Sequence, residues 1–371
     1  MAVLTEEQTI LRDQAIAWVN ADAPVQAFRK MRDSGTTTGF APHTWKAICE
    51  MGWTGIVIPE AHGGSDLGYM TFGLVLEELG KQLVASPLYA SGLVAATALR
   101  FAGTDAQKET CLPAIASGEA IVTLAIDEGP KHAPDTLAMS AERTPNGWRL
   151  NGRKTFVPEG GSATHLIVAA RSGKDVVLLL VDAKAAGVTR EILKTADSRG
   201  YANITFNNVE VAATALLSAG HGQATLDAIL DRARAGIAAE MLGTASAAFD
   251  MTLEYLKTRK QFGQVIGSFQ ALGHRAAELY TEMELTRSAV EAALQAIDAG
   301  SKDVPLLCSL AKFKAGAYLH RMSNQLIQIH GGIGMTDEFN AGFYLKRARA
   351  VEALYGGQGF HRDRYARLSG F

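Results

Sequence analysis

Two short stretches of the chain carry residues that could hold a phosphate group. One is RKQFG at positions 259–263, followed by GSFQ at 267–270, and the other is QIHGGIGMTDE at 328–338. A guanidinium binds phosphate oxygens in pairs, and backbone N–H groups at a glycine turn can approach them closely. The stretches therefore indicate a diphosphate site. The alternative is that the glycines are helix C-caps and that Arg259 is a solvated charge at a helix end.

The sequence lacks the motifs of several other kinds of site, among them nucleotide, metal and nucleophile sites. There is no GxGxxG after a strand, no P-loop, no HExxH and no nucleophile elbow, and the nine histidines lack metal-ligand spacing, so we predict no metal. Lys and Arg number 36 against 38 Asp and Glu, without a block of one sign, which argues against nucleic-acid binding. No apolar run is long enough for a membrane, and no N-terminal signal is evident. The cysteines Cys49, Cys111 and Cys308 lie far apart, as is typical of reduced thiols, and we expect a cytoplasmic protein.

The order of elements follows from hydrophobic periodicity. Residues 1–118 alternate helical patterns with glycine-rich loops, and residues 119–222 contain short β-branched segments separated by hairpin-type turns such as Pro145-Asn146-Gly147. Residues 223–371 contain long helical patterns without internal breaks. We therefore predict an α+β, mainly α fold: an N-terminal helical domain, a compact antiparallel β-domain, and a C-terminal antiparallel helical bundle.

In this architecture the motifs resemble the acyl-CoA dehydrogenase family. YLKTRKQFGQVIGSFQALGHRAAELY is similar to its Arg-x-Gln-Phe-Gly segment, and QIHGGIGMTDEF to its Gln-x-x-Gly-Gly segment, with Met335 in place of a Tyr. GIVIPEAHGGSDLG and RLNGRKTFV resemble an N-terminal loop and a β-domain hairpin of the family. The resemblance spans nearly the whole chain in the right order. It implies a central β-barrel and a C-terminal four-helix bundle.

The resemblance also implies FAD, held across a subunit interface. The residues that would hold its diphosphate and adenosine side are Arg259, Gln261, Phe262, Gln270, Gln328, Gly331 and Gly332. On the flavin-ring side Phe156 can stack on the ring, while backbone near Ile126 and Val157 would have to supply hydrogen bonds. This side departs from the family, because Asp127 and Glu128 replace a Thr-Glu pair and Pro158, which has neither hydroxyl nor N–H, replaces a Thr.

The catalytic base is the largest departure from the family. Removing the α-proton of an acyl thioester requires a base within hydrogen-bond reach. The spacing places Tyr355 where most members carry the catalytic Glu, and a phenol, with a pKa of about 10, is a poor base. The second known place, before Arg234, holds Ala233.

We therefore predict Glu240 as the base. It lies two helical turns beyond Ala233 on the same face, and it is the lone carboxylate of an otherwise small and apolar stretch. The alternatives are a structural Glu240 paired with an Arg such as Arg234, or Glu159 or Glu128 as the base.

The leading hypothesis is an FAD-dependent acyl-CoA dehydrogenase acting in fatty-acid or steroid side-chain β-oxidation. Arg234 would help to shape the substrate site, and electrons would pass to an electron-transferring flavoprotein. We expect a homo- or hetero-oligomer, a dimer of dimers. The alternatives are a subunit of a heteromeric dehydrogenase that lacks the base, and a flavin oxidase on the same fold.

Overall fold

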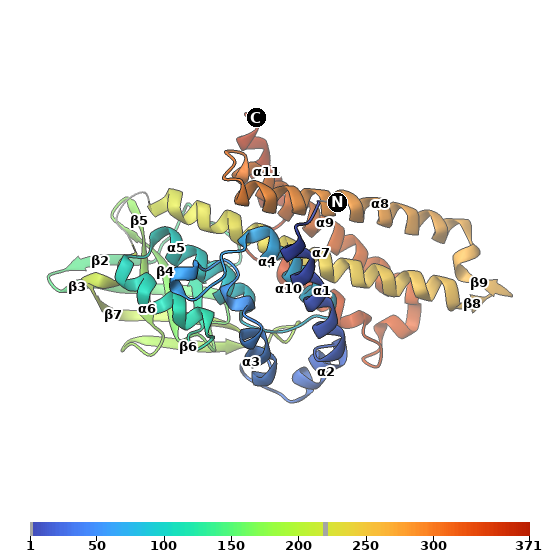
Figure 1. Ribbon diagram of the computed structural model, residues 1–371, viewed down its shortest axis with the longest axis horizontal. Coiled ribbons are helices and arrows are strands. Elements are labelled where there is room, and N and C mark those ends of the chain that lie inside the picture. The colour runs from blue at the N-terminus through green and yellow to red at the C-terminus, as the bar shows by residue number, and fades with distance from the viewer. Residues whose placement is uncertain (1–2, 218–221) are drawn as a thin grey trace. The chain divides into compact units, whose positions relative to one another are not determined.

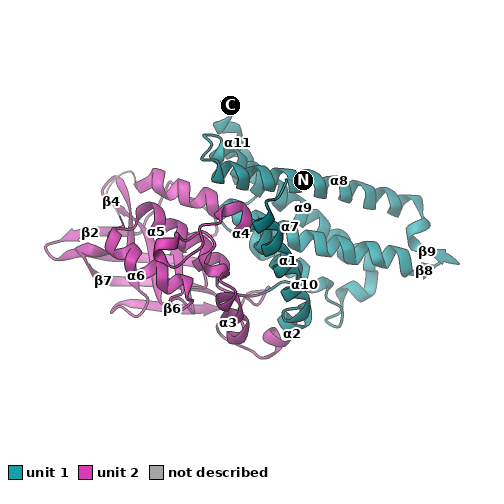
Figure 2. Cartoon of the chain, viewed as in Figure 1, with its two compact units in different colours: residues 1–28, 73–84, 234–371 teal, residues 29–72, 85–233 magenta. Residues whose placement is uncertain are grey.

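The chain divides into two compact units. The computed structural model describes residues 3–217 and 222–371. Unit 1 consists of residues 1–28, 73–84 and 234–371, and unit 2 of residues 29–72 and 85–233 (Figure 2). Each unit groups segments that pack together, and these segments are not contiguous in the chain. The units therefore do not test the domain boundaries at 118/119 and 222/223, which stay predictions.

The N-terminal part is helical, as predicted, and its helices begin at recognisable signals. Thr5 and Thr104 form capping boxes: the Thr5 hydroxyl accepts from the Gln8 N–H at 3.2 Å, and the Gln8 side chain accepts from the Thr5 N–H at 3.1 Å. A fully buried π-helical segment, Leu88–Ala95, precedes α5. The helices are α1 Glu6–Ala21, α2 Val25–Asp33, α3 Pro42–Glu50, α4 Gly68–Lys81, α5 Ala96–Ala102 and α6 Asp105–Ala116.

Unit 2 contains a curled sheet of seven strands among the described residues (Figure 1). The strands are β1 Val122–Ala125, β2 Ser140–Thr144, β3 Gly147–Pro158, β4 His165–Ser172, β5 Asp175–Asp182, β6 Val188–Leu193 and β7 Tyr201–Ala212. Their order is β1-β4-β2-β3-β7-β6, with β5 on β4. The sheet encloses an apolar core that includes Leu150, Leu166, Ile204 and Phe206.

Most neighbouring strands run antiparallel, as predicted, but β1 and β2 each pair with β4 in parallel. The difference arises because β1 does not turn back in a hairpin. A long loop, residues 126–139, separates it from β2.

Long helices dominate the C-terminal part of the chain, as predicted. They are α7 Gly222–Thr258, α8 Gln270–Asp298, α9 Val304–His330, α10 Ala341–Ala353 and α11 Gln358–Leu368, and α9 packs against α8, α10 and α11 (Figure 1). The first residues of α7, up to Ala233, belong to unit 2. A short hairpin, β8 Lys260–Gln261 and β9 Gln264–Val265, joins α7 to α8.

One glycine on each of α4 and α7 allows the two helices to approach closely within unit 1. A Cβ added to Gly243 would lie 1.8 Å from the carbonyl oxygen of Glu77, and one added to Gly80 would lie 2.3 Å from that of Glu240. Neither distance is compatible with a side chain. At these positions, therefore, the small residues serve helix packing.

Two features are absent from residues 3–217 and 222–371. None of their helices is both long and apolar enough to cross a membrane. No group of three or more His, Cys, Asp or Glu side chains within the same ranges is arranged to hold a metal ion.

Candidate functional site

A bulge in the sheet of unit 2 presents Phe156. Between the pairs Lys154–Ile204 and Val157–Ala202, two residues of β3 face one residue of β7. Phe156 there has a φ of +53°, and its N–H donates to the Asn203 side chain at 3.1 Å. Bulges of this kind re-aim side chains next to functional sites.

The Phe156 ring is supported on one face and partly exposed. It stacks on Tyr201 with ring centroids 4.3 Å apart and planes at 24°, and it remains 38% exposed. Val157 and Ile126, the other predicted ring-side residues, are buried at 1% and 3% exposure. Phe156 can therefore offer a flat surface to a ligand ring, whereas the other two residues could act only through their backbones.

The loop after β1 is tied to this bulge by a buried ion pair. Lys154 is fully buried, and its Nζ donates to Glu128 at 2.7 Å and to the Ile126 carbonyl at 3.0 Å. The Glu128 carboxylate also accepts from the N–H groups of Ala138 and Met139 at 2.6 and 3.1 Å. Burial opposes ionisation of Glu128, but Lys154 and the two N–H groups outweigh it and lower the pKa of this carboxyl.

These contacts make Glu128 a clamp for the loop and a weak candidate for the base. Its two oxygens are already engaged, and its pKa is lowered. Burial likewise lowers the pKa of Lys154, against the opposing effect of Glu128.

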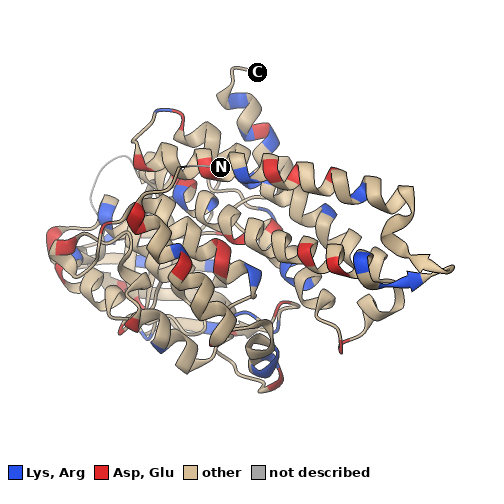
Figure 3. Cartoon of the chain, turned by 45° about the vertical axis from the view of Figure 1, so that its right-hand side comes forward, with Lys and Arg blue, Asp and Glu red and all other residues tan. Residues whose placement is uncertain are grey.

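The residues predicted on the diphosphate side all lie at the surface of unit 1, near the ends of α7 and α9. They are Arg259, Gln261, Phe262, Gln270, Gln328, Gly331 and Gly332. Leu256 and Ile266, which flank the β8–β9 hairpin, share an apolar cluster with Ile329 of α9. This cluster brings the Arg259 stretch and the glycine turn together in the fold. Figure 3 marks basic residues on the end of α7 and on the hairpin.

The same region leaves open space for a ligand. A Cβ added to Gly331 or Gly332 would meet no atom within 4 Å, and Gly331 has a φ of +62°. Phe262, with a φ of +52°, is 91% exposed. An exposed guanidinium and the backbone N–H groups of an uncovered glycine turn are a donor set that fits a diphosphate, and the exposed Phe262 ring offers an apolar surface beside it.

Tyr355 occupies a constrained turn between α10 and α11. Its φ is +55° and it is 1% exposed. Its carbonyl accepts from Arg234 Nε at 3.2 Å and from His361 Nε2 at 3.1 Å. Arg234 is buried and also lies over the Phe360 ring, 5.3 Å from its centroid. Arg234 therefore stabilises the backbone of the turn between α10 and α11.

Buried cations surround this turn. Lys312 Nζ donates to the carbonyls of Val351, Glu352 and Gly356 at 3.3, 3.0 and 3.2 Å. Burial lowers the pKa of Lys312 to about 7, opposed by Glu352. Burial, together with the positive charges of Arg234 and Lys312, lowers the pKa of His361 to about 2.

The predicted base, Glu240, forms a buried ion pair. Its Oε1 accepts from Arg347 Nε at 2.9 Å and from Nη2 at 2.6 Å, and the two side chains are 9% and 7% exposed. This geometry supports the alternative of a structural carboxylate, with Arg347 in the place proposed for Arg234. Glu159 is 7% exposed, has a φ of +55°, and accepts from Ser162 Oγ at 3.3 Å. The identity of the base remains a prediction.

Two regions of unit 2 carry features that the sequence did not predict. In the loop after β1, His132 Nδ1 lies 2.7 Å from Asp127 Oδ1, and only the close spacing of the two residues could have indicated the pair. A pocket of about 260 Å³ is lined by the same loop, at residues 126–131, 133, 136 and 137.

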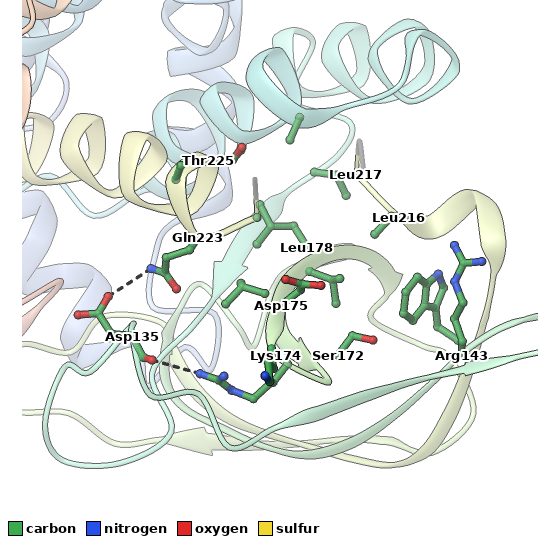
Figure 4. Close-up of a pocket in the computed structure, with 17 residues that line it drawn as sticks. Asp135, Arg143, Ser172, Lys174, Asp175, Leu178, Leu216, Leu217, Gln223 and Thr225 are labelled. Carbon is green, nitrogen blue, oxygen red and sulfur yellow. Dashed lines mark hydrogen bonds between the residues drawn. The ribbon is translucent and has the colours of Figure 1, made fainter. Parts of the chain in front are cut away.

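The second feature is a pocket of about 810 Å³ beside the β4–β5 turn (Figure 4). Its walls carry Arg143, Arg171 and Lys174, with Asp135 and Asp175 opposing them. These residues come from separate segments, so no sequence motif could reveal them. Leu217 and Gly222 also line the pocket.

Comparisons with known proteins are consistent along the whole chain. Family models described as acyl-CoA dehydrogenase N-terminal, middle and C-terminal domains match residues 5–119, 125–211 and 220–369. A Bacillus subtilis protein named "Probable acyl-CoA dehydrogenase YngJ" is 32% identical over 365 residues, covering 94% of each chain.

Solved structures give the same result. A variant of the Tcur3481-Tcur3483 steroid ACAD is 32% identical with a TM-score of 0.90, covering 98% of each chain. The ChsE4-ChsE5 complex from Mycobacterium tuberculosis is 26% identical with a TM-score of 0.91, covering all of this chain and of the matched chain.

Proposed function

This chain belongs to the acyl-CoA dehydrogenase family, and we propose that it serves the FAD-dependent α,β-dehydrogenation of an acyl-CoA thioester to the 2,3-enoyl-CoA. When bound, the flavin supplies the acceptor for the β-hydride. The chain itself must bind the flavin, orient the thioester and provide or recruit a base for the α-proton. The relatives support the reaction class, and the residues of each unit support the individual roles.

The proposal depends chiefly on the exposed, supported ring of Phe156. A flavin ring can stack on the face that Tyr201 leaves uncovered, and offset stacking of flat rings adds to the free energy gained by burying them. The Thr155 N–H is bonded to the Asp127 carbonyl at 2.7 Å, which fixes the backbone next to Phe156. The ring platform is therefore preformed.

For the diphosphate and adenosine side we propose the exposed residues at the ends of α7 and α9 in unit 1. Arg259 would pair with phosphate oxygens, and the Gly331–Gly332 turn would allow the backbone to approach them. By resemblance to the family, these residues would serve the flavin of a neighbouring subunit. That role requires an oligomer, which we propose to be a dimer of dimers.

Arg234 is proposed to act on the substrate site indirectly. It is buried and holds the Tyr355 carbonyl, so it positions the turn between α10 and α11. One relative is described as a steroid ACAD, which supports testing a steroid side-chain thioester beside linear fatty acyl-CoA substrates. An electron-transferring flavoprotein is the proposed electron acceptor.

A second candidate function is a subunit that lacks its own base. It is favoured by the state of the carboxylates: Glu240 is paired with Arg347, and Glu128 is engaged by Lys154 and two N–H groups. A similar structure is described as a complex of two named proteins, ChsE4 and ChsE5. In this version a homologous partner chain would bring the base, and this chain would contribute Arg259 and Gln328 to the partner's flavin.

Anaerobic reduction of the flavin by thioesters tests the proposal. The purified chain, loaded with FAD, should lose its visible flavin absorbance on addition of an acyl-CoA, and the corresponding free acid should have no effect. A chain that becomes yellow and reducible only with a co-expressed homologue supports the second candidate. Hydrogen peroxide released in stoichiometric amounts under air would instead identify a flavin oxidase.

A further inference from the structure

Phe156 has an uncommon backbone conformation for an aromatic residue inside a strand. Its φ of +53° lies in the left-handed region, where the side chain of an L-residue crowds the following carbonyl oxygen. Glycine adopts this region without that cost, but glycine would supply no ring. Such strain persists where neighbouring groups hold the backbone, and it is concentrated at ligand sites. The groups that hold the Phe156 backbone are therefore candidates for a role in the ring platform.

Asn203 of β7 supplies the hydrogen bond that holds the Phe156 backbone. It is the one residue of β7 that lies opposite the two bulged residues of β3, where the regular ladder between the strands is interrupted. The Phe156 N–H donates to Asn203 Oδ1 at 3.1 Å. A side-chain oxygen thus takes the place of a ladder carbonyl, and its position determines where the Phe156 backbone lies.

The Asn203 amide is itself held from β6. Its Nδ2 donates to Glu191 Oε2 at 3.0 Å, and Glu191 lies directly opposite Asn203 in the pairing of β6 with β7. Arg153 of β3 donates to the same Glu191 oxygen at 2.9 Å. Because Oδ1 must face a donor and Nδ2 an acceptor, the two contacts together select one orientation of the amide. A chain of hydrogen bonds therefore runs from Arg153 through Glu191 and Asn203 to the Phe156 N–H.

This chain of hydrogen bonds is poorly suited to stabilising the sheet. Glu191 and Arg153 are both exposed, and water screens the attraction between exposed charges. The contact at its other end concerns a single residue, whose ring is supported by Tyr201 on one face and open on the other. The main effect of the chain is therefore to fix the conformation of one exposed ring.

Resting on the proposed function, we propose that Asn203 is the positioning residue of the flavin platform. It acts through Phe156: Asn203 Oδ1 holds the bulge in the left-handed conformation, and that conformation keeps the ring stacked on Tyr201. Loss of the bond lets the Phe156 backbone relax toward ordinary strand geometry, and the ring then leaves the platform. The role concerns the ring end of the cofactor and does not involve its diphosphate.

Flavin binding to the full chain, followed by fluorescence quenching, measures this role. N203L keeps a side chain of similar size but has no hydrogen-bonding group. It should weaken the binding of FAD and of riboflavin by the same factor, roughly two- to fivefold, as expected when one ordinary hydrogen bond is lost. T205V is the matched control, because Thr205 lies two residues along the same strand on the same face and Val has its shape. T205V should bind both flavins as the wild type does.

A conservative replacement tests whether the acceptor oxygen is what matters. N203D keeps an acceptor for the Phe156 N–H but places a second carboxylate beside Glu191, so it should bind flavin less tightly than the wild type. In N203D/E191Q the introduced amide can donate to the introduced carboxylate, and the double variant should return to the wild-type affinity. A double variant that binds as weakly as N203L would contradict the positioning role.

A double-mutant cycle tests whether Asn203 acts through the ring. In an F156A background, N203L should have no further effect on flavin affinity. An equal loss in both backgrounds would show that Asn203 only supports the sheet, and wild-type affinity in N203L beside weak binding in F156A would show that the ring needs no such support. Either result overturns this inference and leaves the proposed function intact. An unchanged flavin affinity in F156A itself would overturn the flavin platform and this inference together.

Discussion

Arg347 donates two hydrogen bonds to the same carboxylate oxygen of Glu240, from Nε at 2.9 Å and from Nη2 at 2.6 Å. The two residues are 107 positions apart in the chain, and both side chains are buried in unit 1. A buried carboxylate needs a partner. Glu240 was predicted as the base because it is the lone carboxylate of an apolar stretch, and the ion pair with Arg347 accounts for its burial without a chemical role. The pair is better understood as a link between α7 and α10.

We first predict that E240Q destabilises unit 1. Removing one charge leaves the Arg347 guanidinium buried without its counter-ion, a loss of about 3–5 kcal/mol in comparable buried pairs. The double variant E240L/R347L should recover much of this loss, because apolar residues can replace a buried ion pair. Urea denaturation measures both free energies of unfolding.

The control is E210Q, which breaks the exposed Arg149–Glu210 pair and should change stability by less than about 1 kcal/mol. An E240Q protein as stable as wild type but unable to be reduced by acyl-CoA would contradict this account and restore Glu240 as the base.

The second prediction concerns acid stability. Burial, with Arg234 and Lys312 nearby, lowers the pKa of His361 to about 2, below an ordinary unfolded value of about 6.5. As the pH falls below about 6.5, the unfolded chain takes up this proton and the folded chain does not, so stability is lost towards acid pH. H361Q should therefore show a shallower decline in unfolding free energy between about pH 6.5 and pH 4, by an amount on the order of 1 kcal/mol per pH unit. Urea titrations at several pH values, with the exposed-residue variant H43Q as control, provide the measurement. Parallel pH profiles for wild type and H361Q would refute it.

The third prediction concerns the ring platform. F156A removes the exposed aromatic surface but leaves the buried Tyr201 in place, so the fold should survive and flavin retention should fall. A stacking contribution of about 1 kcal/mol predicts at least a fivefold weaker affinity for FAD, measured by fluorescence quenching during titration. F101A is the matched control, because Phe101 is also partly exposed in unit 2, under the Arg232 guanidinium. Equal FAD affinities for F156A and F101A would show that Phe156 does not contact the flavin.

The fourth prediction concerns the diphosphate side. R259M should weaken FAD more than it weakens riboflavin, which lacks the diphosphate, because the lost guanidinium would pair only with phosphate oxygens. The change should also reduce the salt dependence of FAD binding. R362M alters another exposed arginine of unit 1, on α11, and serves as the control. If R259M bound FAD and riboflavin with unchanged ratios and unchanged salt dependence, Arg259 would be the solvated helix-end charge of the alternative interpretation.

The sequence was a sufficient guide to the fold because helical periodicity and turn residues are local signals. It predicted the three-part order, the helical bundle and a compact, mainly antiparallel β-domain, but the parallel pairing of β1 with β4 depends on a crossover that no local pattern encodes. The glycine turn and the Arg259 stretch were also found locally, and the apolar cluster around Ile329 explains why they meet.

The base could not be predicted with the same means. The partner of Glu240 lies on a helix more than a hundred residues away, so burial alone could not distinguish a catalytic carboxylate from a structural one. Similarly, the sequence showed that Glu128 departs from the family pattern. It did not show that Lys154 donates a hydrogen bond to the Glu128 carboxylate and so engages it. Asp127 and His132 are close in sequence, yet only the folded loop places their side chains in contact.

The most direct test is product stoichiometry in an anaerobic titration. The FAD-loaded chain, alone and together with any co-purifying homologue, is mixed with limiting acyl-CoA thioesters, and flavin absorbance and 2,3-enoyl-CoA are measured on the same samples. The account predicts one enoyl-CoA formed for each flavin reduced. A protein that retains FAD but, with every thioester and in both preparations, forms no enoyl-CoA and leaves its flavin oxidised would contradict the proposed function.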